Sequence, residues 1–182
     1  MRNPEETRRR LLEAATAEFA AHGIAGARVD RIADSAGCNK QSIYGYFGSK
    51  DGLFEAVLDA IVARAVSEVP VDGHDLPGYA GRVFDWYGEH PEVLRLWNWM
   101  QLEQGDPKQM SEAMAAAGAN KREKVREAQR AGVITDAIPA DTLLGFVTRL
   151  AAAQIDYCTL DRGERSTLRA ALVEAVRRLV AP

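Results

Sequence analysis

Apolar residues recur along this 182-residue chain at the three- and four-residue spacing of amphipathic α-helices. No segment alternates apolar and polar residues with the two-residue period of a half-buried β-strand. Prolines and glycines between the periodic segments mark the helix ends, and the segments predict about nine helices. We therefore expect an all-α protein.

The first 65 residues are predicted to form four helices whose ends carry capping residues or glycines. Asn3 and Glu6 predict a capping box at the start of the first helix, which has Leu12, Ala15 and Phe19 on one face. Gly23 predicts its end. A short second helix and a third at about residues 40–46 follow. The remaining stops and caps, in chain order, are Gly37, Asn39 and Ser49.

A break at residues 67–79, with two prolines and two glycines, is predicted to separate two domains, 1–65 and 66–182. Beyond it, Pro91 opens another helix. The Gly-Asp-Pro sequence at 105–107 interrupts the chain again. Three helices are predicted after this interruption. The first ends at about residue 131, the second covers residues 139–160 and the third covers residues 164–180.

The second and third helices form a pattern typical of the helix-turn-helix motif. In this motif the second short helix enters the major groove of DNA, so one face must be anchored and the other free. Ile43 and Phe47 are expected to point inward. Glutamine suits adenine, and lysine suits guanine or a phosphate. The outward face comprises Lys40, Gln41 and Tyr44.

The stretch from residue 7 to residue 60 closely resembles the N-terminal domain of TetR-family transcriptional regulators. The shared pattern is an Ile-Ala pair in the second helix, a glycine turn, a short helix ending in Tyr-x-aromatic-Phe, and a Ser-Lys pair opening the fourth helix. These features are Ile32–Ala33, Gly37, Tyr44–Phe47 and Ser49–Lys50. The match covers about a third of the chain.

The resemblance implies a helix-turn-helix domain, with its motif at about residues 27–46, followed by a larger helical domain for effector binding and dimerisation. It implies that Lys40, Gln41 and Gly45 face bases. It also implies that Tyr44, Tyr46 and Lys50 bind phosphates. The full set of DNA-contacting residues expected is Arg28, Lys40, Gln41, Ser42, Tyr44, Gly45, Tyr46 and Lys50.

The chain departs from the family at two positions. The family usually has Thr or Ser just before the second helix, where this chain has Ala27 and Arg28. Arg28 can still bind phosphate, but a helix cap is not expected from it. The turn residue that is commonly valine is Cys38, a residue of similar small volume.

Aromatic residues concentrate in the middle of the chain, where all three tryptophans lie within residues 86–99. This pattern is compatible with a packed helical core and with an apolar small-molecule pocket. The residues that we expect to line such a pocket are Trp86, Trp97, Met100, Gln101, Phe146 and Tyr157.

The last two helices offer a surface for a second copy of the chain. Small residues at 151–153 permit close approach on one helix. An apolar stripe on the other must be buried in its own core or against a copy. In TetR-like proteins these two helices pair into a four-helix bundle. The stripe comprises Leu168, Leu172, Val176 and Leu179.

The distribution of charge along the chain says more about a binding face than the overall composition does. The net charge is −3, yet the first 50 residues carry eight basic and six acidic side chains, which favours the N-terminal end as the face for an anion. The N-terminus lacks the apolar segment of a signal peptide, apolar runs are short, and the two cysteines lie far apart. We expect a cytoplasmic protein.

Enzyme chemistry finds little support in the sequence. His22, His74 and His90 are scattered, so no metal-ligand cluster is expected. There is no glycine-rich phosphate loop and no nucleophile elbow. We therefore expect no catalytic residues, no metal and no cofactor.

The leading hypothesis is a dimeric transcriptional regulator, a repressor, that binds a palindromic operator in double-stranded DNA. A mostly apolar small molecule would release it. The alternative is a helical small-molecule-binding protein that does not use its DNA motif, which the modest N-terminal charge and the missing Thr or Ser favour. An enzyme is a third reading without a catalytic set.

Overall fold

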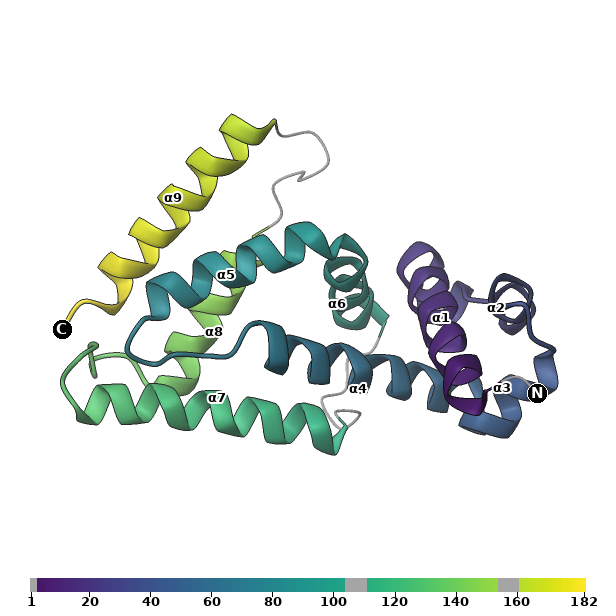
Figure 1. Cartoon of the computed structure of the whole chain (residues 1–182). Coiled ribbons are helices and arrows are strands. Elements are labelled where there is room, and N and C mark those ends of the chain that lie inside the picture. The colour runs from purple at the N-terminus through teal and green to yellow at the C-terminus, as the bar shows by residue number, and fades with distance from the viewer. Residues whose placement is uncertain (1–2, 104–110, 154–160) are drawn as a thin grey trace. The chain divides into compact units, whose positions relative to one another are not determined.

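The computed structural model describes residues 3–103, 111–153 and 161–182 (Figure 1). These residues form nine α-helices and no strand, so the all-α prediction is confirmed over the described part of the chain. No helix in these ranges has the length and apolar character needed to cross a membrane. The helices are α1 Pro4–Gly26, α2 Val29–Ala36, α3 Lys40–Phe47, α4 Lys50–Glu68, α5 Leu76–Glu89, α6 Pro91–Glu103, α7 Glu112–Arg130, α8 Ala140–Ala151 and α9 Arg162–Val180.

The chain folds into two compact units that do not follow its order in sequence. The first comprises Met1–Ala63 and Pro91–Met114, and the second Arg64–His90 and Ala115–Pro182. Helix α6, which the sequence places in the second predicted domain, therefore packs with the N-terminal helices. It lies against α1.

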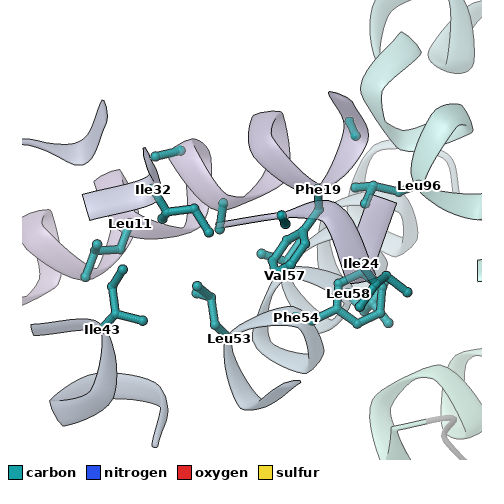
Figure 2. Packing of buried hydrophobic residues seen from close by; sticks show 14 of the residues in the cluster. Leu11, Phe19, Ile24, Ile32, Ile43, Leu53, Phe54, Val57, Leu58 and Leu96 are labelled. Carbon is teal, nitrogen blue, oxygen red and sulfur yellow. The ribbon is translucent and has the colours of Figure 1, made fainter. Parts of the chain in front are cut away.

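The core of the first unit is built on one face of α1 (Figure 2). Leu11 and Phe19 are fully buried, and the Phe19 ring meets Phe54 of α4 edge-on with centroids 5.1 Å apart. Burying side chains of this size contributes roughly 1.5–3 kcal/mol each. The predicted face was off by one residue at its start, because Leu12 is only partly buried at the edge of the cluster.

Helices α2 and α3 contribute side chains to the same core. Ile32, Ala33 and Ala36 of α2 are buried in it, together with Ile43 of α3. Ile43 is the only residue of α3 that is fully buried. The position of α3 therefore depends on the core that α1, α2 and α4 provide.

The start of α1 is capped more simply than predicted. The Asn3 side chain accepts a hydrogen bond from the Glu5 N–H at 3.1 Å, which confirms Asn3 as the N-cap. The predicted capping box is wrong, because the Glu6 carboxylate instead accepts a hydrogen bond from the Arg9 Nη2 at 2.7 Å. An i,i+3 ion pair on the exposed face replaces the reciprocal bond.

Gly23 interrupts α1 rather than ending it. Its φ of 72° and ψ of 177° break the helical dihedrals, and the helix resumes as far as Gly26. That backbone conformation is open mainly to glycine. A Cβ at Gly23 would also overlap the Glu103 carboxylate and lie 2.9 Å from Cε3 of Trp99. Both residues belong to α6, so the glycine permits the close approach of α6 to α1.

In the second unit, α5 packs against α8 and α9. Tyr79 and Phe84 of α5 are buried there, and Arg169 of α9 donates from Nε to the Asp85 carboxylate at 2.7 Å. Leu172 and Val176 of the predicted stripe are buried in this unit's own core, whereas Leu168 and Leu179 stay partly exposed.

Helix α8 is shorter than predicted. It ends at Ala151, and the last alanines of the predicted close-approach segment, 152 and 153, follow as a turn and coil. Ala151 is itself fully buried. The three alanines therefore do not form one helical surface, and the rest of the predicted helix, at 154–160, lies outside the described residues.

The break at Gly23 predicts an asymmetric response to alanine. Gly23→Ala should lower the free energy of unfolding by at least about 2 kcal/mol, because the backbone conformation is strained for alanine and the Cβ meets α6. A Cβ at Gly26 would touch only His22 at 3.6 Å, so Gly26→Ala should stay within about 0.5 kcal/mol. Urea unfolding followed by circular dichroism measures both, and equal losses would contradict this account of Gly23.

Candidate nucleic-acid interface

A tight glycine turn joins α2 to α3, as predicted. Gly37 has a φ of 62° and a ψ of 38°, and its N–H donates to Asp34 O at 3.0 Å. The Cys38 N–H donates to Ala33 O at 2.9 Å, and the two hydrogen bonds together form a Schellman motif at the C-terminus of α2. The guanidinium of Arg10 also donates to Ala36 O, so α1 fastens the end of α2.

Asn39 caps α3 as predicted. Its Oδ1 accepts from the Ser42 N–H at 2.8 Å and from the Ser42 hydroxyl at 3.0 Å. Ser42, which belongs to the expected DNA-contact set, is half-buried and uses its hydroxyl in this cap. A helix of eight residues spans roughly 12 Å, so the cap and the core beneath it matter more than intrinsic propensity.

The outward face of α3 carries the residues predicted for it. Lys40, Gln41 and Gly45 are exposed, and the tyrosines are 46% and 41% exposed at positions 44 and 46. A Cβ built at Gly45 would meet nothing within 4 Å, so the backbone there is open to close approach. The helix thus presents polar side chains on one side and buries Ile43 on the other.

Lys40 is paired with an acidic residue that the sequence reading did not single out. Its Nζ lies 2.9 Å from Oδ1 of Asp30 on α2. The hydrogen bond from Lys40 holds the pKa of the Asp30 carboxyl below its usual range, and the same bond raises the pKa of Lys40. A separation of ten residues across the turn gives no periodic signal, which is why the pair was missed.

The missing cap before α2 is confirmed and is compensated from α1. Arg28 is the N-cap residue but makes no side-chain cap, and its side chain is left exposed. Oε1 of Glu18 accepts instead from the Arg28 N–H at 2.9 Å and from Nε of Arg31 at 2.7 Å. Burial favours the neutral form of Glu18, but these hydrogen bonds outweigh it and lower the pKa of its carboxyl.

Lys50, an expected phosphate contact, has its ammonium bound to backbone carbonyls. Its Nζ donates to Ala25 O at 3.2 Å and to Ala27 O at 3.3 Å. Both carbonyls belong to the end of α1 and the short connection to α2. The neighbouring Ser49 caps α4 as predicted, by accepting from the Gly52 N–H at 3.0 Å.

The residues expected to line an effector pocket occupy different surroundings. Trp97 and Met100 are partly buried against the core of the first unit, and Gln101 is exposed. Phe146 is 47% exposed on α8, and Tyr157 lies outside the described residues. Trp86 is buried in the second unit, where it lines an open groove of about 480 Å³. The groove is lined by Arg64, Glu68, Val69, Arg82, Asp85, Trp86, Glu89 and His90.

Six of the eight residues that line this groove are charged or polar, and their charged groups are largely engaged with other side chains. Nε1 of Trp86 donates to Glu68 at 2.7 Å, and Arg64 donates to the same carboxylate at 2.9 Å. These two hydrogen bonds lower the pKa of Glu68. In the part of the chain that the structure describes, no three His, Cys, Asp or Glu side chains gather as metal ligands.

Two family models match separate parts of the chain. The model for bacterial regulatory proteins of the tetR family matches residues 11–57. The model for the tetracyclin repressor-like C-terminal domain matches residues 75–178. Together they cover the helix-turn-helix and helices α5 to α8, whereas Arg64, Glu68 and Val69 of the groove lie between the two matched ranges.

Individual relatives agree with the family models. The chain is 43% identical over 187 residues to the HTH-type transcriptional repressor SCO4008 of Streptomyces coelicolor, covering 98% of this chain and 97% of that protein. A crystal structure described as that of a transcriptional regulator, SCO4942 of the same organism, superposes with a TM-score of 0.82 at 37% identity, over 96% of this chain and 98% of that one. FadR of Bacillus subtilis, solved in complex with stearoyl-CoA, shares the fold with a TM-score of 0.74 at 14% identity, over 92% and 96% of the two chains.

Proposed function

The chain belongs to the TetR family of helix-turn-helix transcriptional regulators, and from this premise we propose that it is a repressor that binds a palindromic operator as a homodimer. The observation that carries the proposal is the polar, exposed face of α3 above the buried Ile43. The similarity to a repressor over nearly its whole length supports the direction of regulation. Such a protein acts on DNA in the cytoplasm and performs no catalysis.

We assign the base-reading role to Lys40 and Gln41 at the start of α3. Both are exposed in the first turn, which is the part of a recognition helix that reaches base edges. Lys40 exchanges Asp30 for a base or a phosphate when DNA arrives. Gly45 lets the backbone approach the duplex. We assign the phosphate contacts to Arg28, Tyr44 and Tyr46. Ser42, at the start of α3, lies near the DNA backbone in this arrangement.

The shortness of α3 supports dimerisation. One helix of eight residues reads only a few base pairs, whereas two on a two-fold axis read both halves of a palindrome. Phe146 and Leu150 stand one turn apart on α8 and are 47% and 38% exposed. An exposed apolar pair at this spacing supports an interface with a second copy. The partly exposed Leu168 and Leu179 of α9 extend the same argument.

Release by a small molecule completes the proposal. The effector lowers operator affinity only as far as it binds the DNA-incompetent conformer better than the competent one. The residues expected to line the effector pocket stay a prediction, and one of them, Trp86, lines the groove described above. The full set is Trp86, Trp97, Met100, Gln101, Phe146 and Tyr157. A mostly apolar effector fits the aromatic content of this set.

The proposal predicts tight, salt-sensitive binding to DNA from the chain's own upstream region. Fluorescence anisotropy with labelled fragments should give a Kd of roughly 10⁻⁸ M or below for an operator at physiological salt. The affinity should fall steeply with salt, because phosphate contacts release counterions. A half-site should bind far more weakly than the full palindrome. Equal binding to operator and scrambled DNA, without salt dependence, would contradict the proposal.

The role of Gln41 is separable from that of the tyrosines. Gln41→Ala should relax sequence preference at one base position in each half-site, at a cost of roughly 1–3 kcal/mol for the preferred base. Tyr44→Phe removes only a hydroxyl and should weaken all sequences alike. Affinities for a set of single-base operator variants measure both. Identical profiles for the two substitutions would show that Gln41 does not read a base.

A further inference from the structure

The connection between α1 and α2 is held by charged side chains from four helices. It comprises Ala25–Arg28, the last two residues of α1 and the two that precede α2. Four side chains bind its backbone polar groups. Glu103 accepts from the Ala25 N–H at 2.8 Å, Lys50 donates to Ala25 O and Ala27 O at 3.2 and 3.3 Å, Arg31 donates to Gly26 O at 3.1 Å, and Glu18 accepts from the Arg28 N–H at 2.9 Å.

Both backbone polar groups of Ala25 are hydrogen-bonded to charged side chains. Its N–H is bound by a carboxylate from α6 and its C=O by an ammonium from α4. Hydrogen bonds to ionised groups are stronger than those between neutral groups. Opposite charges on the two polar groups of one residue fix its orientation, which a single bond would leave free to rotate.

The contribution from α6 is anchored rather than incidental. Trp99 lies one turn before Glu103 and donates from Nε1 to Ala20 O at 3.2 Å. Its ring lies against Gly23, where only a glycine leaves room for it. Trp99 therefore sets α6 on the broken end of α1, and Glu103 reaches Ala25 from that position.

Lys50 has little capacity left for a phosphate in this arrangement. An ammonium has three N–H donors, and two of them are directed to carbonyls of the connection. The side chain is also half-buried. A phosphate contact would require Lys50 to release Ala25 and Ala27, the residues immediately before α2.

We propose that Lys50 and Glu103 are positioning residues for DNA binding, which hold Ala25–Arg28 from opposite sides and so orient α2 and α3. Lys50 acts through this connection rather than by bonding a phosphate. Glu103 makes α6 part of the DNA-binding unit. The inference rests on the proposed function for one of its two readouts, DNA affinity. The other readout, hydrogen exchange of the free protein, needs no DNA.

The first test is hydrogen–deuterium exchange of the free protein, read by mass spectrometry on peptides spanning residues 20–30. Lys50→Met keeps the aliphatic stem and removes the ammonium, and Glu103→Ala removes the carboxylate. Each should speed exchange in this segment about tenfold. Glu55→Ala, at an exposed glutamate on α4, is the matched control and should change nothing. Unchanged exchange in both variants would overturn the clamp, whatever the outcome with DNA.

The second test is the salt dependence of operator binding. Lys50→Met should weaken binding about tenfold and leave the slope of log K against log salt unchanged. Loss of a true phosphate contact from each protomer of the dimer would instead reduce the slope by about 1.8, which is about 0.9 for each contact. That reduction would overturn the role assigned to Lys50.

Glu103 gives a test of opposite sign. Glu103→Ala makes the protein more positive, so charge alone would tighten DNA binding, whereas loss of positioning should weaken it about tenfold. Glu103→Gln keeps an acceptor for the Ala25 N–H and should recover part of the loss. Glu55→Ala changes the charge equally without touching the connection. Tighter binding by Glu103→Ala, matching that control, would contradict the proposal.

Discussion

The buried face of α1 is the constraint on which the DNA-binding unit depends. Leu11 and Phe19 are fully buried on it, and residues of α2, α3 and α4 pack in the same core (Figure 2). Helix α3 contributes a single fully buried residue, Ile43. With so little apolar surface of its own, a helix this short is stable only as part of the shared core. The core therefore decides where the polar face of α3 points.

Charged side chains set the details that packing leaves open. Glu18 replaces the missing cap at the start of α2, and Asp30 holds Lys40 until DNA competes for it. Lys50 and Glu103 act on the connection between α1 and α2. Each of these groups joins its own helix to a residue outside that helix. The unit thus uses its charges to orient short elements, which accounts for their presence in a domain of modest net charge.

Local patterns predicted the features that depend on neighbours in sequence. Gly37, Asn39 and Ser49 have the roles expected of them, because turns and caps are decided within a few residues. Long-range contacts escaped prediction. Nothing in the sequence indicates that Glu103 meets Ala25. The off-by-one start of the α1 face has the same origin, since tertiary packing chooses Leu11 over Leu12.

The dependence of α3 on the α1 core is tested most directly by amide hydrogen exchange of the free protein, followed residue by residue by NMR. The account predicts that amides of residues 43–47 open with nearly the same free energy as those in the middle of α1. It also predicts that Phe19→Ala lowers both together, because they belong to one cooperative unit. Rapid exchange in α3 that is indifferent to Phe19→Ala, with α1 still protected, would contradict it.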